Sequence, residues 1–434
     1  MVALGARAGG IVLGLVSTAL VAHALPKDDL RSYWLALSLI SFVVLVSQSG
    51  IGQVTVARVS RSLALSETED AARAGRVSLL LVAVTSATLA TIAAVTSPWW
   101  AGALGPDVEG VVWFVWIASV ACASYMQTLE VLRGHHQLRL VAALSAQPLS
   151  GGLVVSAVFV LSLEALHHVF GTMTLTYVYV ALLVGWVLPL VGALAYLWRL
   201  TTGCSNDAWR ITPILKMTIV GAAPLVASAL TRFVITQADL WFAAKYSSVN
   251  NTAAYGLASN LVKYVSAVNI LIGALIPGVI AHYYARAETV ALSNLARKVS
   301  AYGFTFALAA FLGFIACGSR IIQLVAGVGF EASLGPLLIL SIGHVVNAFF
   351  GYPELILTSA GRTRAVLSSS LIASSVTLCL LLVLTPAWDI LGAAAASACG
   401  LATYSMLMWR SCGLKLGVWC HVSFRAIRLA GLWS

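Results

Sequence analysis

Charged residues are scarce in this chain of 434 residues. Asp, Glu, Lys and Arg together make up 9% of it, whereas 60% is hydrophobic and the mean hydropathy is +0.95. A soluble domain carries charge on roughly a quarter of its residues. The composition therefore excludes an ordinary soluble globule. It predicts a chain solvated by lipid, in which each span satisfies its own backbone groups as a helix.

Signatures of the common enzyme classes are also missing. The sequence has no GxxxxGK[ST] loop, no HExxH and no GxSxG. Its seven cysteines are dispersed and form no CxxC pair, which favours apolar packing over disulfides or metal ligands. We therefore expect a protein that is not an enzyme and that needs no cofactor or metal.

What the chain does contain is a regular alternation of apolar stretches and short connectors. Each stretch has about twenty residues, the length that a helix needs to cross a bilayer. We predict an all-α polytopic membrane protein with twelve transmembrane helices. The predicted spans are residues 8–25, 32–54, 77–97, 110–128, 141–162, 174–198, 212–242, 252–282, 300–318, 334–359, 365–385 and 390–410.

The basic residues are distributed unevenly between the two sides of this topology. Of the 25 Lys and Arg residues, 19 fall in both termini and one alternate set of connectors, and 4 fall in the other set. Lys and Arg accumulate on the cytoplasmic side of membrane proteins. The bias predicts a multi-pass protein of a bacterial cytoplasmic (inner) membrane with both termini in the cytoplasm. It also explains the net charge of +10 without a nucleic-acid partner.

Two segments suggest an internal repeat. YMQTLEVLRGHHQLRLVAALSA begins at Tyr125 and YPELILTSAGRTRAVLSSSLIA begins at Tyr352, so that Gly134 matches Gly361. The identity is low, and a chance match is the alternative. The offset nevertheless fits a duplication of six helices, which is typical of transporters. We predict an N-terminal six-helix lobe (1–200), a cytoplasmic linker (201–211), a C-terminal six-helix lobe (212–410) and a basic amphipathic tail (411–434) forming an interfacial helix.

Ionisable residues inside spans are costly and mark functional sites. Arg232 and Asp239 are seven residues apart on one predicted helix, so they share a face about 10 Å apart, with Arg232 in the outer half. Lys263 lies near the midplane of the next span. The predicted substrate-binding residues are Arg232, Lys263, Asn260 and Asn347, and the predicted ion-coupling residues are Asp239 and Glu354. In the alternative interpretation, Asp239 neutralises Arg232 and Glu354 neutralises Lys263, and His344 is a polar packing residue.

Two stretches resemble a known family. Residues 25–61 place Asp28, Asp29 and Tyr33 before an apolar helix that ends at Gly50 and Gly52 and then at Arg58 and Arg61. This layout is similar to the first two helices of bacterial polysaccharide flippases of the Wzx type. A second similarity lies between the predicted seventh and eighth spans. It consists of Asp239, Tyr255, Gly256, Ala258 and Leu261.

The resemblance implies the V-shaped fold of the multidrug/oligosaccharidyl-lipid/polysaccharide exporter superfamily, built from two six-helix lobes. It also implies a flippase for an undecaprenyl-diphosphate-linked oligosaccharide in O-antigen, capsule or exopolysaccharide biosynthesis. Its expected partners are that lipid-linked substrate, the bilayer and other polysaccharide assembly proteins. Arg232 and Lys263 are the residues that would meet the anionic diphosphate.

Other functions stay open. A multidrug cation antiporter of the same superfamily would share the topology, although the first predicted helix has no acidic residue and the intramembrane cations would repel a cationic drug. A polysaccharide polymerase or ligase would carry a large outer loop, and the predicted outer connectors are short. The N-terminal lobe shows no clear charge within its predicted spans, so a cationic cavity would be asymmetric.

Overall fold

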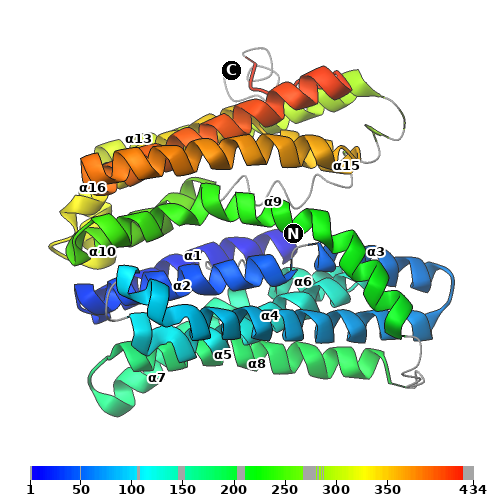
Figure 1. Cartoon of the computed structure of the whole chain (residues 1–434), viewed down its shortest axis with the longest axis horizontal. Helices are drawn as coiled ribbons and strands as arrows, with labels where there is room; N and C mark the ends of the chain where they lie inside the picture. Colours follow the sequence, from blue (N-terminus) through cyan, green and yellow to red (C-terminus); the bar gives the residue numbers. More distant parts are fainter. Residues whose placement is uncertain are drawn as a thin grey trace. The chain divides into compact units, whose positions relative to one another are not determined.

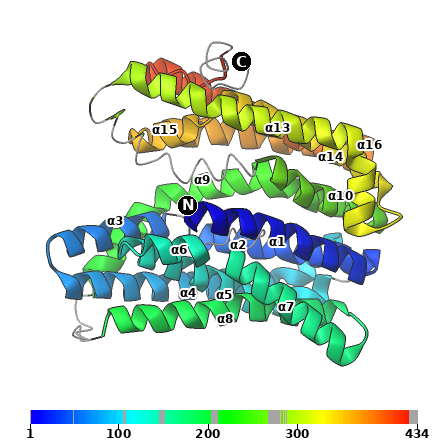
Figure 2. The ribbon, with the colours of Figure 1, turned by 180° about the vertical axis from the view of Figure 1, so that it is seen from behind.

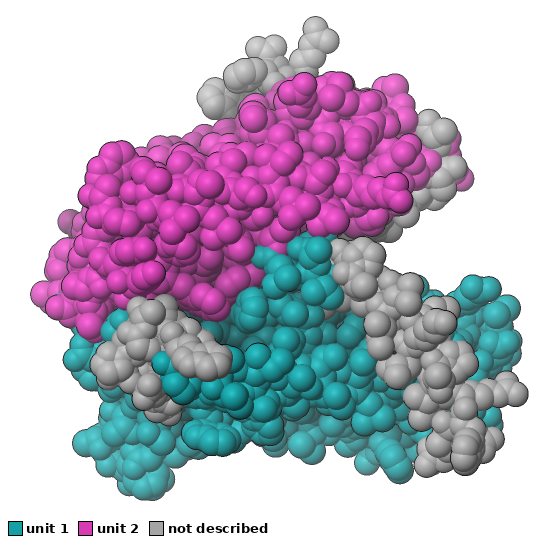
Figure 3. Space-filling model, in the orientation of Figure 1, with its two compact units in different colours: residues 1–230 teal, residues 231–434 magenta. Residues whose placement is uncertain are grey.

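A computed structural model of the chain is helical throughout the part that it describes (Figures 1 and 2). The described residues are 2–48, 50–104, 108–144, 152–202, 211–266, 280, 283–284, 286 and 288–423. The chain divides into two compact units, Met1–Leu230 and Thr231–Ser434, which Figure 3 colours separately. The division falls inside one long helix, α9 (Ile211–Tyr246).

The first unit is built around helix α5 (Val108–Gly134). This helix packs against α2, α4 and α8, while α1 packs against α7. The helices of the unit are α1 (Val2–Ala24), α2 (Lys27–Gln48), α3 (Ile51–Ala64), α4 (Thr68–Leu104), α5, α6 (Leu138–Leu144), α7 (Leu153–Phe170) and α8 (Leu175–Leu200). On α5, residues Ala118, Cys122, Tyr125, Leu129 and Leu132 form a buried stripe. Their spacing of three and four residues places them on one helical face, which explains the central position of α5.

The second predicted span is interrupted. Helix α2 ends at Gln48, and α3 begins at Ile51 after Gly50, whose φ of 75° lies in the left-handed region. A residue without a Cβ adopts this conformation at little cost. The 22 residues of α2 already extend about 33 Å, enough to cross the apolar layer. The predicted boundary at residue 54 is therefore wrong, and α3 is a separate helix packed against α4 and α5.

The second unit contains the rest of α9 and a group of helices packed around α14. Its further elements are α10 (Val249–Leu261), the 3₁₀ helices η2 (Val262–Ser266) and η3 (Glu331–Ser333), α13 (Thr289–Ala326), α14 (Leu334–Phe350), α15 (Pro353–Ser359) and α16 (Thr363–Leu416). Helix α14 packs against α13, α16, α10 and η2. This arrangement places α10, α14 and α16 side by side, and α10 and α14 carry the predicted site residues Asn260 and Asn347.

Helix α16 is a hairpin of two spans. Its backbone leaves helical geometry at Trp388 and Asp389, just after Pro386. The side chains of Ser369 and Ser411 approach to 3.4 Å, although a straight helix would separate them by about 63 Å. A Cβ on Gly400 would collide with Thr377, so these residues also face each other. The two halves therefore run antiparallel, in agreement with the predicted spans 365–385 and 390–410.

Each of the twelve predicted spans overlaps a helix among the described residues, while residues 145–151 of the fifth span and 267–279 and 281–282 of the eighth lie outside them. Helix α16 carries two of them, and the other ten overlap α1, α2, α4, α5, α7, α8, α9, α10, α13 and α14. Among the described residues, eight helices are long and apolar enough to cross a membrane, with α16 counted once. The prediction of an all-α polytopic membrane protein is confirmed.

The predicted match between Gly134 and Gly361 is out of register by two residues. Gly134 is still helical, and the left-handed residue of its turn is His136 (φ 59°), whereas Gly361 has φ 71°. Both turns nevertheless share one hydrogen-bond pattern. In the first turn, the N–H groups of His135, His136 and Gln137 donate to the carbonyls of Val131, Arg133 and Leu132, respectively. In the second turn, those of Ala360, Gly361 and Arg362 donate to the carbonyls of Ile356, Thr358 and Leu357, respectively. His136, not Gly134, is therefore the counterpart of Gly361.

The predicted interfacial helix over 411–434 differs from the structure. Residues 411–416 belong to the last turns of α16, and residues 417–423 form a non-helical segment with Val418, Cys420 and Val422 buried. Residues 424–434 of the predicted tail lie outside the described residues. The buried apolar side chains explain the difference, because this segment packs against its own unit.

Candidate functional site

Polar side chains lie at three levels along the helices of the second unit. The two ends of these helices are identified by the kink at Asp389 and by the turn at Gly361, here called the kink end and the turn end. The predicted topology places the kink end outside the cell and the turn end in the cytoplasm. The predicted site residues are distributed between these ends.

The level nearest the kink end is centred on Asp239 of α9. Its side chain is buried, and its Oδ2 accepts hydrogen bonds from the Tyr255 hydroxyl (2.6 Å) and the Ser397 hydroxyl (2.8 Å). Its Oδ1 accepts from the backbone N–H of Leu240 (2.9 Å). Ser397 is seven residues beyond Ile390, about 10 Å from the kink along the helix axis. The carboxylate thus joins α9, α10 and α16.

The middle level is centred on Lys263. This residue lies in η2, the 3₁₀ continuation of α10, and its Nζ donates to Oδ1 of Asn260 (2.9 Å). Asn260 in turn donates to the Gly256 carbonyl (2.9 Å). Ser266, at the end of η2, bonds to Nδ1 of His344 on α14 (2.7 Å). Lys263 also interacts electrostatically with Asp239 and His344, which connects the middle level to the first.

The level nearest the turn end is the ion pair of Arg232 and Glu354. An Arg232 guanidinium nitrogen lies 3.0 Å from Oε1 of Glu354, and Tyr404 of α16 lies beside both charges. Glu354 is eight residues before Arg362, about 12 Å from the turn. In the predicted topology this level lies in the cytoplasmic half of the membrane, whereas counting along the span had predicted the outer half for Arg232. Helix α9 has 36 residues, about 54 Å, so counting depth from its first residue overestimates the position of Arg232.

Helix α16 is a common partner of the first and the third of these levels. Ser397 contacts Asp239, and Tyr404 lies beside Arg232. Along α9, Arg232 comes seven residues before Asp239, whereas along α16 its partner Tyr404 comes seven residues after Ser397. Helix α9 and this half of α16 therefore run antiparallel. At the next position on α16, the Ser405 hydroxyl donates to Oδ1 of Asn347 (2.7 Å). The predicted binding residue Asn347 is thus held between α14 and α16.

The two structural pairs proposed from the sequence are not those of the structure. Arg232 pairs with Glu354 instead of Asp239, and Lys263 bonds to Asn260 instead of Glu354. The shared face of Arg232 and Asp239 gave no information about which neighbouring helix lies at each level. Apart from Asn347, which bonds to Ser405, the predicted residues therefore fall into two groups. One contains Asp239, Lys263 and Asn260, and the other contains Arg232 and Glu354.

Exchanging the two charges of the Arg232–Glu354 pair separates its structural role from a role in binding. The side chains of Arg232 and Glu354 are 59% and 34% exposed, so the pair should contribute no more than about 1 kcal/mol to stability. We expect Arg232→Glu to lower both thermal stability and transport. Adding Glu354→Arg should recover the stability but not the transport, because the cation then projects from α15. Full recovery of transport in the double variant would assign the pair a purely structural role.

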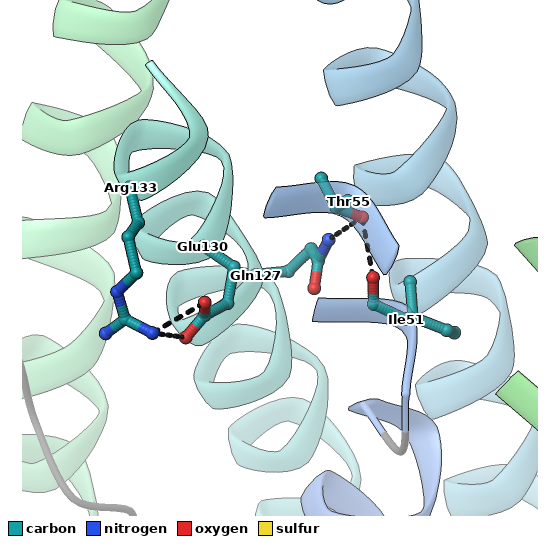
Figure 4. Close-up of polar contacts among 5 residues, drawn as sticks. All are labelled: Ile51, Thr55, Gln127, Glu130 and Arg133. Carbon is teal, nitrogen blue, oxygen red and sulfur yellow. Dashed lines mark hydrogen bonds and ion pairs between the residues drawn. The ribbon is translucent and has the colours of Figure 1, made fainter. Parts of the chain in front are cut away.

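The sequence interpretation missed an acidic residue in the first unit. The predicted span ended at residue 128, but α5 continues to Gly134 and includes Glu130, whose side chain is 24% exposed. Glu130 pairs with Arg133 at 2.7 Å (Figure 4). Its Cγ would lie 3.0 Å from a Cβ on Gly52 of α3. One turn earlier, the buried Gln127 donates to the Thr55 hydroxyl (3.1 Å). The Glu130–Arg133 spacing of three residues was the signal for this pair.

Comparison with known proteins identifies the fold. No family model and no curated protein matches the chain. Among solved structures, a mutant of the Vibrio cholerae MATE transporter VcmN has a TM-score of 0.68 at 15% identity, covering 96% of each chain. An inward-facing MATE family multidrug resistance transporter of the MOP superfamily has a TM-score of 0.69 at 14% identity, covering 96% of this chain and 98% of that one. The chain has the fold of this exporter superfamily.

The exporter fold also includes a protein that handles a lipid-linked molecule. The lipid II flippase MurJ, in an inward closed conformation, has a TM-score of 0.68 at 12% identity, covering 98% of this chain and 88% of that one. At these identities the similarity establishes the architecture and leaves the substrate open. The polar residues of the second unit are the part of the structure that bears on the substrate.

Proposed function

We propose that this chain is a flippase that moves an undecaprenyl-diphosphate-linked oligosaccharide across the bacterial cytoplasmic membrane for surface polysaccharide biosynthesis. The observation that carries this proposal is Lys263. It is half-buried, its hydrogen-bond acceptor is the neutral Asn260, and it lies about 21 Å along the helix from the start of α10. A cation at this depth of a bilayer is costly unless it serves a function. A diphosphate is an anion that such a cation attracts.

Arg232 supports the same substrate. More than half of its side chain is exposed, and exposure of a guanidinium to lipid tails is unfavourable. We infer that this side chain faces a water-accessible path, where Glu354 neutralises it in the absence of substrate. A guanidinium forms bidentate bonds to phosphate oxygens. A lipid-linked diphosphate could thus replace Glu354 as its partner. Asn260 and Asn347 would supply amide contacts to phosphate or sugar.

Asp239 is the stronger candidate for ion coupling. Its carboxylate is buried, joins three helices and interacts electrostatically with Lys263. Binding of a proton or a sodium ion there would change the charge facing Lys263 and hence its attraction for an anion. Glu354 is the second candidate, because it exchanges partners when substrate reaches Arg232. Transport would proceed by alternating access, with residues 1–200 moving against residues 212–410.

Deletion of the gene in its host is the direct test. We expect surface polysaccharide to be lost and repeat units to accumulate on undecaprenyl diphosphate inside the cell, because synthesis continues while translocation stops. Both effects should reverse when the intact gene is returned. Mass spectrometry of the lipid-linked fraction, together with analysis of the surface polymer, measures the two quantities.

A multidrug cation antiporter is the alternative function, favoured by the two MATE structures above and by the carboxylates of Asp239 and Glu354. It predicts a different deletion phenotype. Surface polymer would stay intact, and the cells would become more sensitive to cationic dyes. That combination would replace the flippase proposal.

A further inference from the structure

The junction between α14 and α15 leaves backbone carbonyls without their usual helical partners. Helix α14 ends at Phe350, Gly351 adopts a φ of 79°, and α15 begins at Pro353. In a continuous helix the Phe349 carbonyl would accept a hydrogen bond from the N–H of residue 353, which proline lacks. The chain also turns away before Glu354 could donate to Phe350. Two carbonyls therefore need other donors.

The segment after α16 supplies both donors. This segment, Gly417–Ser423, is here called the C-terminal strap. The backbone N–H of Val422 donates to the Phe349 carbonyl (3.0 Å), and the Cys420 thiol donates to the Phe350 carbonyl (3.3 Å). A Cβ on Gly351 would lie 2.8 Å from the Cys420 carbonyl and would also collide with the Ser300 hydroxyl of α13. The strap and α13 thus enclose the junction so closely that glycine is required there.

Contacts with α13 and α16 hold the strap in this position. Nε of Arg297 donates to the Trp419 carbonyl (3.0 Å), and Nε1 of Trp409 donates to Nδ1 of His421 (3.1 Å). The Trp419 ring packs against Gly413, where a Cβ would lie 2.5 Å from it. Burial and the charge of Arg297 lower the pKa of His421, so that Nδ1 stays free to accept the bond from Trp409.

Glu354 follows this junction directly. It occupies the first turn of α15, so the path of the chain through Gly351 and Pro353 determines where its carboxylate lies. We infer that the C-terminal strap positions Glu354, and through it Arg232, by replacing the hydrogen bond that Pro353 cannot donate to Phe349 and the one that Glu354 does not donate to Phe350. The strap is a positioning segment. Its effect on transport rests on the proposed function of Arg232, whereas its effect on the junction does not.

Val422→Pro tests the strap directly, because it removes the donor N–H while Val422→Ala retains it. Hydrogen–deuterium exchange on the purified full chain measures the junction without any substrate. We expect Val422→Pro to accelerate amide exchange over residues 351–358 by about tenfold, the equivalent of one lost hydrogen bond, and Val422→Ala to leave it near wild type. Unchanged exchange in Val422→Pro would overturn the inference.

Pro353→Ala provides a second test, which stays informative even if Val422→Pro lowers the stability of the whole chain. It returns an N–H to position 353 and so allows the helix to continue through the junction, where the Phe349 carbonyl then has an intrahelical donor in place of the strap. In this background, Val422→Pro should change exchange over residues 351–358 by less than about twofold. An equal acceleration in both backgrounds would show that the proline acts by disturbing the fold, and the inference would be wrong. If Val422→Pro accelerates exchange as expected but flipping stays at the wild-type rate, the inference about the strap holds and the proposed function of Arg232 is wrong.

Discussion

Replacing Lys263 with Glu should abolish transport while the protein still inserts into the membrane. The substitution removes the cation from the middle level and places a second carboxylate near Asp239, with which Lys263 interacts electrostatically. A charge-assisted hydrogen bond of about 3 kcal/mol corresponds to a loss of roughly 100-fold. Repulsion between the two acids and the diphosphate should add to this loss. We expect a cell carrying this variant to resemble the deletion strain.

Conservative variants at the same position separate charge from shape. Lys263→Arg keeps the cation and should retain most of the transport, whereas Lys263→Gln keeps a hydrogen-bonding side chain without charge and should lose most of it. Membrane content, measured with a tagged protein, controls for insertion. Normal surface polysaccharide in the Lys263→Glu strain would rule out Lys263 as a substrate contact.

The spans could be predicted because hydropathy depends on composition alone, but not all of their interruptions could be predicted in this way. The break at Gly50 falls inside an apolar run, where hydropathy does not distinguish a glycine with φ 75° from a helical one, and only the family resemblance placed the end of the helix at Gly50 and Gly52. The proline at position 353, by contrast, predicts a helix break just before Glu354. The hairpin of α16 was also predictable, because Pro386 and Asp389 interrupt an apolar stretch too long for one span.

The amino-acid type of each residue was enough to identify the site residues in the sequence, but it did not identify their partners. A charged residue inside a span is conspicuous in the sequence, and this criterion selected Arg232, Asp239 and Lys263. Which of them meets Glu354 depends on the relative height of helices that are distant in the sequence. Local spacing contains no such information. Glu130 was missed for a related reason, since α5 continues six residues beyond the predicted end of its span.

We expect Asp239→Asn to make the rate of transport independent of an ion gradient across the membrane. The substitution preserves the size of the side chain, but it removes the charge that interacts with Lys263. The amide can still bond to the hydroxyls of Tyr255 and Ser397, with weaker neutral hydrogen bonds, so the stability should fall by about 2 kcal/mol. Flipping of a lipid-linked oligosaccharide by purified protein in vesicles, with and without a proton or sodium gradient, measures the coupling. The gradient should accelerate the wild type and not the variant.

Tyr255→Phe is the matched control for this experiment. It removes one donor to Asp239 and should lower stability by a similar amount, because the buried carboxylate loses a 2.6 Å hydrogen bond. The carboxylate and its charge remain, so the gradient should still accelerate flipping. Loss of coupling in both variants would mean that the response follows the packing of α9, α10 and α16 instead of the charge. An unchanged response in Asp239→Asn would exclude Asp239 as the coupling residue and leave Glu354 as the remaining acidic candidate.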